Sequence, residues 1–97
     1  MKSTKKPTCK IRPDGTKEWY LNDKLHREDG PAVLHVNGDK AWWLNGKCHR
    51  EDGPAIEYTS GYKAWWLNDK LYSEPDFYRE LYKLGKITKE ELFIKLL

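Results

Sequence analysis

Short apolar stretches alternate with turn-forming dipeptides along most of this chain. The stretches WYL, WWL and WWL begin at residues 19, 42 and 65, and each is followed by Asn-Asp or Asn-Gly. Asn-Gly is a strong signal for a tight β-hairpin because both residues tolerate a positive φ. Asp-Gly, Asn-Gly and Ser-Gly pairs that end at residues 15, 38 and 61 indicate a second set of turns. The pattern predicts a string of antiparallel hairpins with strands of about five residues.

The hairpins belong to a regular sequence repeat. Trp19, Trp42 and Trp65 are equally spaced, and the Leu and Asn residues that follow each of them keep the same spacing. The interval from one of these tryptophans to the next is one repeat unit. The heptapeptide His-Arg-Glu-Asp-Gly-Pro-Ala occurs at residues 26–32 and again at 49–55, one unit later. The sequence therefore contains two full units, with half a unit before them and half a unit after them.

Alternation along each strand assigns its side chains to two faces. In the second unit Trp42 and Leu44 share one face, and Ala41 and Trp43 share the other. We assign the invariant Trp and Leu face to the core. The other face carries a row of rings at unit spacing: Tyr20, Trp43 and Trp66. We expect these rings to pack against the C-terminal helices; the alternative is an aromatic platform for a ligand or partner.

The repeated heptapeptide contains reactive side chains, yet its pattern favours a rigid corner between hairpins. Gly before Pro is confined to extended or turn conformations, and Asp29 can bond to nearby backbone N–H groups. We expect Arg27 to pair with a carboxylate of the neighbouring unit and His26 to donate to a carbonyl, and the same of the second copy. One imidazole per copy is a weak metal signal, and a corner lacks the cleft that acid–base catalysis needs.

A binding role for the heptapeptide stays open beside the structural one. Four side chains along one edge would form a ladder for phosphate or another anion: His26, Arg27, His49 and Arg50. The nearby carboxylates compete with an anion for these cations. The candidate binding residues are therefore these four and the rings of Tyr20, Trp43 and Trp66, with no catalytic residue, metal ligand or cofactor predicted.

The hairpin pattern breaks off after residue 72, and residues 73–97 are expected to form a helical pair that belongs to the same domain. Ser73 with Pro75 and Asp76 indicates a helix start, and Gly85 is a natural stop. Thr88 with Glu91 predicts a capping box for a second helix from about residue 89 to 97. These helices are expected to cap the open end of the sheet. Because the C-terminal residues are apolar, a homodimer that forms through these helices is a further alternative.

Composition narrows the functional classes. The net charge of +3 comes from residues 1–18, which hold six Lys or Arg against two Asp or Glu. We interpret residues 1–9 as a flexible basic arm and residues 10–72 as the nearly neutral sheet, which argues against sequence-specific nucleic-acid binding. No apolar run is long enough to span a membrane, and the basic N-terminus lacks the apolar segment of a secretory signal. We expect a cytoplasmic protein with reduced thiols at Cys9 and Cys48.

The period and the motif W-x-L-N-G-K-x-H resemble the MORN repeat over roughly residues 10–72. The resemblance implies a non-catalytic scaffold, since MORN arrays bind phospholipid head groups or proteins. The chain departs from the family where Arg27 and Arg50 follow the His in place of Gly. This HREDGPA variant is similar to MORN-like proteins of phages, bacteria and large viruses.

These observations predict a mainly β fold with C-terminal α structure: a single antiparallel sheet of hairpin repeats, capped by two short helices. The preferred function is a non-enzymatic phage-type accessory protein that binds and inhibits a host defence factor in the host cytoplasm. One alternative is a binder of nucleotides or anionic small molecules that uses the Trp and His-Arg side chains. Another is a scaffold at an anionic membrane surface.

Overall fold

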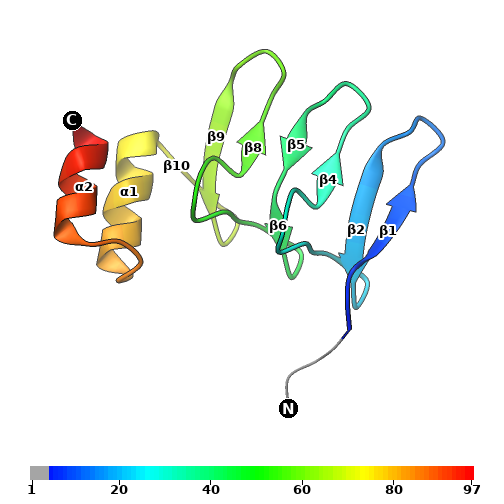
Figure 1. Cartoon of the computed structure of the whole chain (residues 1–97), viewed down its shortest axis with the longest axis horizontal. Helices are drawn as coiled ribbons and strands as arrows, with labels where there is room; N and C mark the ends of the chain where they lie inside the picture. The colour runs from blue at the N-terminus through cyan, green and yellow to red at the C-terminus, as the bar shows by residue number, and fades with distance from the viewer. Residues whose placement is uncertain (1–4) are drawn as a thin grey trace.

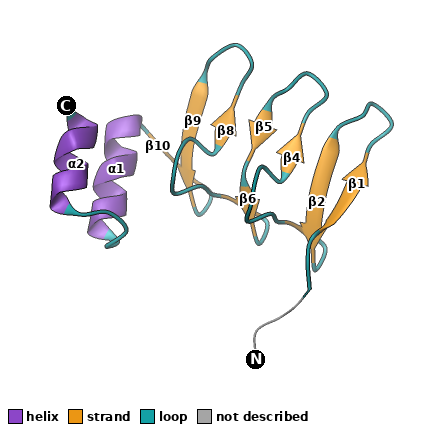
Figure 2. Cartoon of the chain, viewed as in Figure 1, coloured by secondary structure: helices purple, strands orange, loops and turns teal. Residues whose placement is uncertain are grey.

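The computed structural model describes residues 5–97, which form a mainly antiparallel β-structure followed by two helices (Figure 1, Figure 2). The expected fold class, mainly β with C-terminal α structure, is thereby confirmed, but the described strands form two sheets and not the single sheet expected. The strands are β1 (Thr8–Ile11), β2 (Lys17–Leu21), β3 (Lys24–Leu25), β4 (Val33–Leu34), β5 (Lys40–Ala41), β6 (Trp43–Leu44), β7 (Lys47–Cys48), β8 (Ile56–Glu57), β9 (Lys63–Leu67) and β10 (Lys70–Tyr72). The helices are α1 (Glu74–Lys83) and α2 (Lys89–Leu96).

The turns form where the sequence predicts them. The hairpins that follow the WYL and WWL stretches turn at Asn22-Asp23, Asn45-Gly46 and Asn68-Asp69, and all six residues have a positive φ. This conformation is that of the tight hairpin turns whose twist matches the flanking strands. The second set of hairpins turns at Gly15, Gly38 and Gly61, whose φ angles are 95°, 98° and 96°. Local side chains fix these turns, as where Asp14 Oδ1 accepts the Thr16 N–H at 2.8 Å.

The main sheet runs in the order β1-β2-β4-β5-β8-β9-β10, with β3 also paired to β2, and β6 and β7 form a separate two-stranded ladder. Apolar residues stand opposite one another across the centre of the main sheet. Val33 pairs with Ala41, Ala41 with Ile56, and Ile56 with Ala64. Figure 1 shows the strands side by side, with the helices beyond β9 and β10 at one end of the array.

The two helices are capped as expected. The Ser73 side chain accepts the Asp76 N–H at the start of α1, and Thr88 and Glu91 form a reciprocal capping box at the start of α2. Gly85 ends α1 with a φ of 75°, while the Lys86 N–H donates to the Leu81 carbonyl. This is the hydrogen-bonding pattern of a helix C-terminus closed by a left-handed glycine.

Large buried side chains pack together at the helical end of the molecule, whereas the buried apolar residues along the array are small: Ala32, Val33, Ala41, Cys48, Ala55 and Ala64. Leu67 of β9 packs with Phe77 and Leu81 of α1, and all three are buried. The Trp65 ring lies 5.0 Å from the Phe77 ring, centroid to centroid. Helix α1 thus covers the invariant Trp and Leu face of the third unit.

Three further expectations need correction. The row of Tyr20, Trp43 and Trp66 does not pack against the helices. Helix α1 packs on the other face of β9, where its Phe77 contacts Trp65. The invariant face is fully buried only at Leu67, where the helix covers it; the equivalent Trp and Leu residues of the other units are half-buried. Strand β1 begins at Thr8, so residues 8 and 9 belong to the sheet and not to the arm. Residues 1–4 of that arm lie outside the described residues.

Candidate functional site

Each heptapeptide is a loop closed on the backbone of a single tryptophan. In the first copy the His26 N–H donates to the Trp19 carbonyl at 3.0 Å, and the Trp19 N–H donates to the Ala32 carbonyl at 2.8 Å. The second copy repeats this arrangement around Trp42, with distances of 3.1 Å from His49 and 2.7 Å to Ala55. The first and last residues of the heptapeptide are therefore fixed by the same residue, which explains its constant length.

The arginine of each loop lies over the ring of that tryptophan. Arg27 Cζ is 4.0 Å from the centroid of Trp19, and Arg50 Cζ is 3.8 Å from the centroid of Trp42. A guanidinium over an indole face is a favourable cation–π contact. The stacked pair supplies part of the packing that a second layer of secondary structure would otherwise provide.

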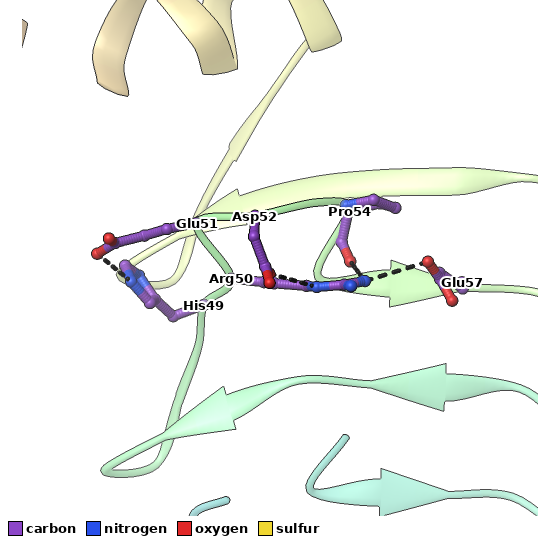
Figure 3. Close-up of polar contacts among 6 residues, drawn as sticks. All are labelled: His49, Arg50, Glu51, Asp52, Pro54 and Glu57. Carbon is purple, nitrogen blue, oxygen red and sulfur yellow. Dashed lines mark hydrogen bonds and ion pairs between the residues drawn. The ribbon is translucent and has the colours of Figure 1, made fainter. Parts of the chain in front are cut away.

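Each guanidinium group is hydrogen-bonded to residues of its own repeat unit, as Figure 3 shows for Arg50. Arg50 Nε donates to Asp52 Oδ1 at 2.9 Å, and Nη1 donates to the Pro54 carbonyl at 3.1 Å and to Glu57 Oε2 at 3.1 Å. Arg27 makes the equivalent bonds to Asp29 and Pro31 at 3.0 and 3.2 Å. The expected pairing with a neighbouring unit is wrong, because the loop folds a carboxylate and a carbonyl back onto its own arginine.

The glycine of each loop makes room for this arginine. A Cβ at Gly53 would stand 2.9 Å from Arg50 Cζ, and one at Gly30 would stand 3.0 Å from Arg27 Cζ. Any side chain at these positions would displace the guanidinium. The Asp of the loop, expected to bond to the backbone, instead holds the arginine by an ion pair.

The histidines connect one unit to the next as acceptors, and not as the expected donors to a carbonyl. His26 Nδ1 accepts the Asn45 N–H at 3.0 Å, and His49 Nδ1 accepts the Asn68 N–H at 3.0 Å. An Nδ1 that accepts a backbone N–H carries no proton, so each ring is the neutral tautomer with its proton on Nε2. In the second loop Nε2 then faces Glu51 Oε2 at 3.0 Å (Figure 3). Both imidazoles therefore hold neighbouring repeat units together by hydrogen bonds.

A groove of about 600 Å³ lies between the two loops. Trp42 and Leu44 form its apolar floor, and His49 borders it. Four carboxylates and two guanidinium groups complete its lining: Glu28, Asp29, Glu51, Asp52, Arg27 and Arg50. The four carboxylates outnumber the two guanidinium groups by two, and Lys86, whose Nζ lies 3.8 Å from Glu51 Oε2, offsets one of these negative charges. Sequence reasoning treated the carboxylates as competitors of an anion and missed this groove, which exists only because the two loops lie side by side.

The structure does not bring the predicted site residues together at one site. His49 and both arginines line the groove, and His26 lines a second groove over Trp19 and Leu21. The rings of Tyr20, Trp43 and Trp66 lie on the opposite face of their strands and are half-buried. The Trp66 Nε1 atom is buried with no hydrogen-bond partner within residues 5–97.

The thiols do not point to a redox or metal site in the described part of the chain. Cys9 is exposed and Cys48 is buried, and neither is in a disulfide. Burial raises the pKa of the Cys48 thiol to about 12, and Asp69 contributes in the same direction. No group of three or more His, Cys, Asp or Glu residues within residues 5–97 is arranged to hold a metal ion.

Comparison with known proteins adds one short similarity. A 28-residue stretch is 57% identical to a protein of Acanthamoeba polyphaga mimivirus described as "Uncharacterized protein L111". The match covers 28% of this chain and 8% of the mimivirus protein. No protein-family model matches the chain, and no solved structure matches it. Within the described residues, no helix is long and apolar enough to cross a membrane.

Proposed function

We propose that this chain is a non-enzymatic protein-binding module, acting as a phage-type accessory protein that binds and inhibits a host factor. One observation carries the choice of a protein partner: the cations of both heptapeptides are engaged inside their own loops, while carboxylates border the groove between them. Asp29 and Asp52 remain 87% and 86% exposed at this surface. Such a surface favours a partner with basic side chains over an anionic small molecule.

The nucleotide alternative has less support in this geometry. A phosphate at the ladder would have to compete with the carboxylate and the carbonyl that each arginine already contacts. It would also approach four carboxylates in one groove, and like charges close to one another are repelled. The short match to a mimivirus protein supports a viral setting and carries no information on activity.

The test uses the full chain immobilised as bait in a bacterial lysate, followed by reconstitution with each captured protein after purification. We expect one protein to form a stoichiometric complex and to lose its own activity in that complex. Calorimetry with ATP and with inorganic phosphate is expected to show no binding.

The matched variants are Glu28→Lys, which changes the groove, and Glu90→Lys, which makes the same change on α2. Weakened capture by the first variant alone would support the groove as the binding surface. Saturable binding of ATP, abolished by Arg27→Gln with Arg50→Gln, would refute the proposal in favour of the anion binder.

A further inference from the structure

Each unit has an apolar floor made by its invariant Trp and Leu, and the three floors have different neighbours. The floors are Trp19 with Leu21, Trp42 with Leu44, and Trp65 with Leu67. Because the three are identical in sequence, what covers one of them indicates what the others can accept.

The third floor is covered by helix α1. Leu67 is 3% exposed beneath Phe77 and Leu81, which are 0% and 1% exposed. Just beyond the helix, Lys86 Nζ lies 3.8 Å from Glu51 Oε2, a carboxylate of the second loop. A helix with apolar anchors and a following lysine thus fits a floor and its acidic border.

The first floor also has a basic neighbour. The groove over Trp19 and Leu21 is bordered by Lys5 and Lys6 as well as by the acidic residues of the first loop. Lys5 Nζ donates to Asn22 Oδ1 at 3.3 Å. Basic segments of the chain itself therefore adjoin the floors at both ends of the array.

The central floor, like the first, is only half-buried, and among residues 5–97 no lysine lines its groove. Leu44 is half-buried, whereas its equivalent Leu67 is covered. Arg50 lies over Trp42, and the ring of Phe77 packs against that of Trp65. Half-buried Leu44 lines the groove beside Trp42. Glu28 holds the position in the first loop that Glu51 holds in the second. It lines this groove, in the place where Glu51 meets Lys86 one unit later.

We propose that the central groove binds a basic helical segment of a partner protein, in which a leucine packs on Leu44 and a lysine or arginine pairs with Glu28. This inference rests on the proposed function of a protein-binding module and adds the chemistry of the partner. The segment resembles α1 in its anchors, and the excess of negative charge in the groove selects it for basic residues.

The probe is a synthetic peptide of residues 77–89 with blocked ends, which carries four basic residues and one acidic residue. It is titrated into the full chain and followed by NMR chemical shifts. We expect shifts centred on Trp42, Leu44 and Glu28, and binding that weakens as salt is added. Shifts centred instead on Leu67 and Phe77 would mean that the peptide displaces α1 and would overturn the inference.

Two protein variants make the test specific. Leu44→Asp is expected to weaken peptide binding by about tenfold or more, since it removes a buried apolar contact. Leu71→Asp is the matched control, because Leu71 is 55% exposed on β10, and it is expected to bind as the wild type does. Equal peptide binding by both variants would show that the groove is not the binding site.

A further variant, Glu28→Lys, protects the test against misfolding, because the Glu28 side chain is 82% exposed. It is expected to weaken binding about two- to fivefold, the range for one exposed ion pair. A peptide with Lys86→Glu should recover that loss against Glu28→Lys. No recovery would refute the pairing. Binding of the probe only to anionic vesicles, or only to a dimer of the chain, would refute it as well.

Failure of this inference is separable from failure of the proposed function. If the captured host protein binds wild type and Leu44→Asp equally, the chain is a protein-binding module that uses another surface. If no protein is captured and ATP binds, the proposed function itself is refuted.

Discussion

The most direct test of the fold concerns Gly53 and the guanidinium that lies against it. The nearest atoms to a Cβ at this position all belong to Arg50, and the closest is Cζ at 2.9 Å. Gly53→Ala must therefore displace the guanidinium from Trp42, because carbon atoms do not approach so closely. Arg50→Ala removes the obstacle, so the two substitutions should be strongly coupled.

The contacts at stake set the magnitude. The stack on Trp42 contributes about 0.5–2 kcal/mol, and the charged hydrogen bond to the Pro54 carbonyl about 1.5–3 kcal/mol. The exposed pair with Asp52 contributes about 1 kcal/mol or less. Alanine offsets about 0.4–1 kcal/mol by reducing the freedom of the unfolded chain. Since the displaced arginine keeps some of these contacts, we expect Gly53→Ala to destabilise the protein by about 1–2 kcal/mol.

The assay is a double-mutant cycle in urea, followed by tryptophan fluorescence. In the Arg50→Ala background, Gly53→Ala should be neutral or stabilising by up to about 1 kcal/mol, which gives a coupling of about 2 kcal/mol. Gly30→Ala with Arg27→Ala repeats the cycle in the first loop, where the Cβ distance is 3.0 Å. Additivity within about 0.5 kcal/mol in both loops would refute the idea that each glycine makes room for the arginine of its loop.

Three further predictions concern the thiols and the helices. At pH 8 an alkylating reagent should modify Cys9 quickly and Cys48 only after denaturation, because the raised pKa of Cys48 keeps the buried thiol protonated; mass spectrometry that finds both modified in the folded protein would contradict this. Phe77→Ala should cost about 3–5 kcal/mol of unfolding free energy in urea, whereas Phe93→Ala, at a side chain 67% exposed, should change it by about 0.5 kcal/mol or less. Deleting residues 73–97 should uncover the third floor and cause aggregation, measured by light scattering, and a soluble monomer would show that the helices are not a cap.

Local interactions made the repeat and its turns predictable. Asn22 and its equivalents at residues 45 and 68 adopt the positive φ that the dipeptide pattern indicates, because turn conformation depends on two adjacent residues and on strand twist. The helix starts at Ser73 and Thr88 follow from hydrogen bonds between residues close in sequence. The regular spacing of the units then fixes which side chains are equivalent.

The sequence alone assigned the invariant Trp and Leu residues to the core face, which the structure bears out only at Leu67, while Ala41 and Ala64 on the other face are buried. It favoured a structural role for residues 26–32. It did not show how the role is performed. The loop closes on Trp19, which precedes its histidine by a whole hairpin, and nothing in the local pattern indicates that Arg27 lies over that ring.

Only the tertiary structure decided which floor is covered. Trp42 with Leu44 and Trp65 with Leu67 are the same local sequence, yet Leu67 is buried and Leu44 is half-buried. The difference arises because α1 reaches only the last unit of the array, so burial here depends on position along the sheet and not on residue type. The acidic groove has the same origin: its carboxylates come from two different repeat units, and the stacking of the two loops brings their charges to one surface.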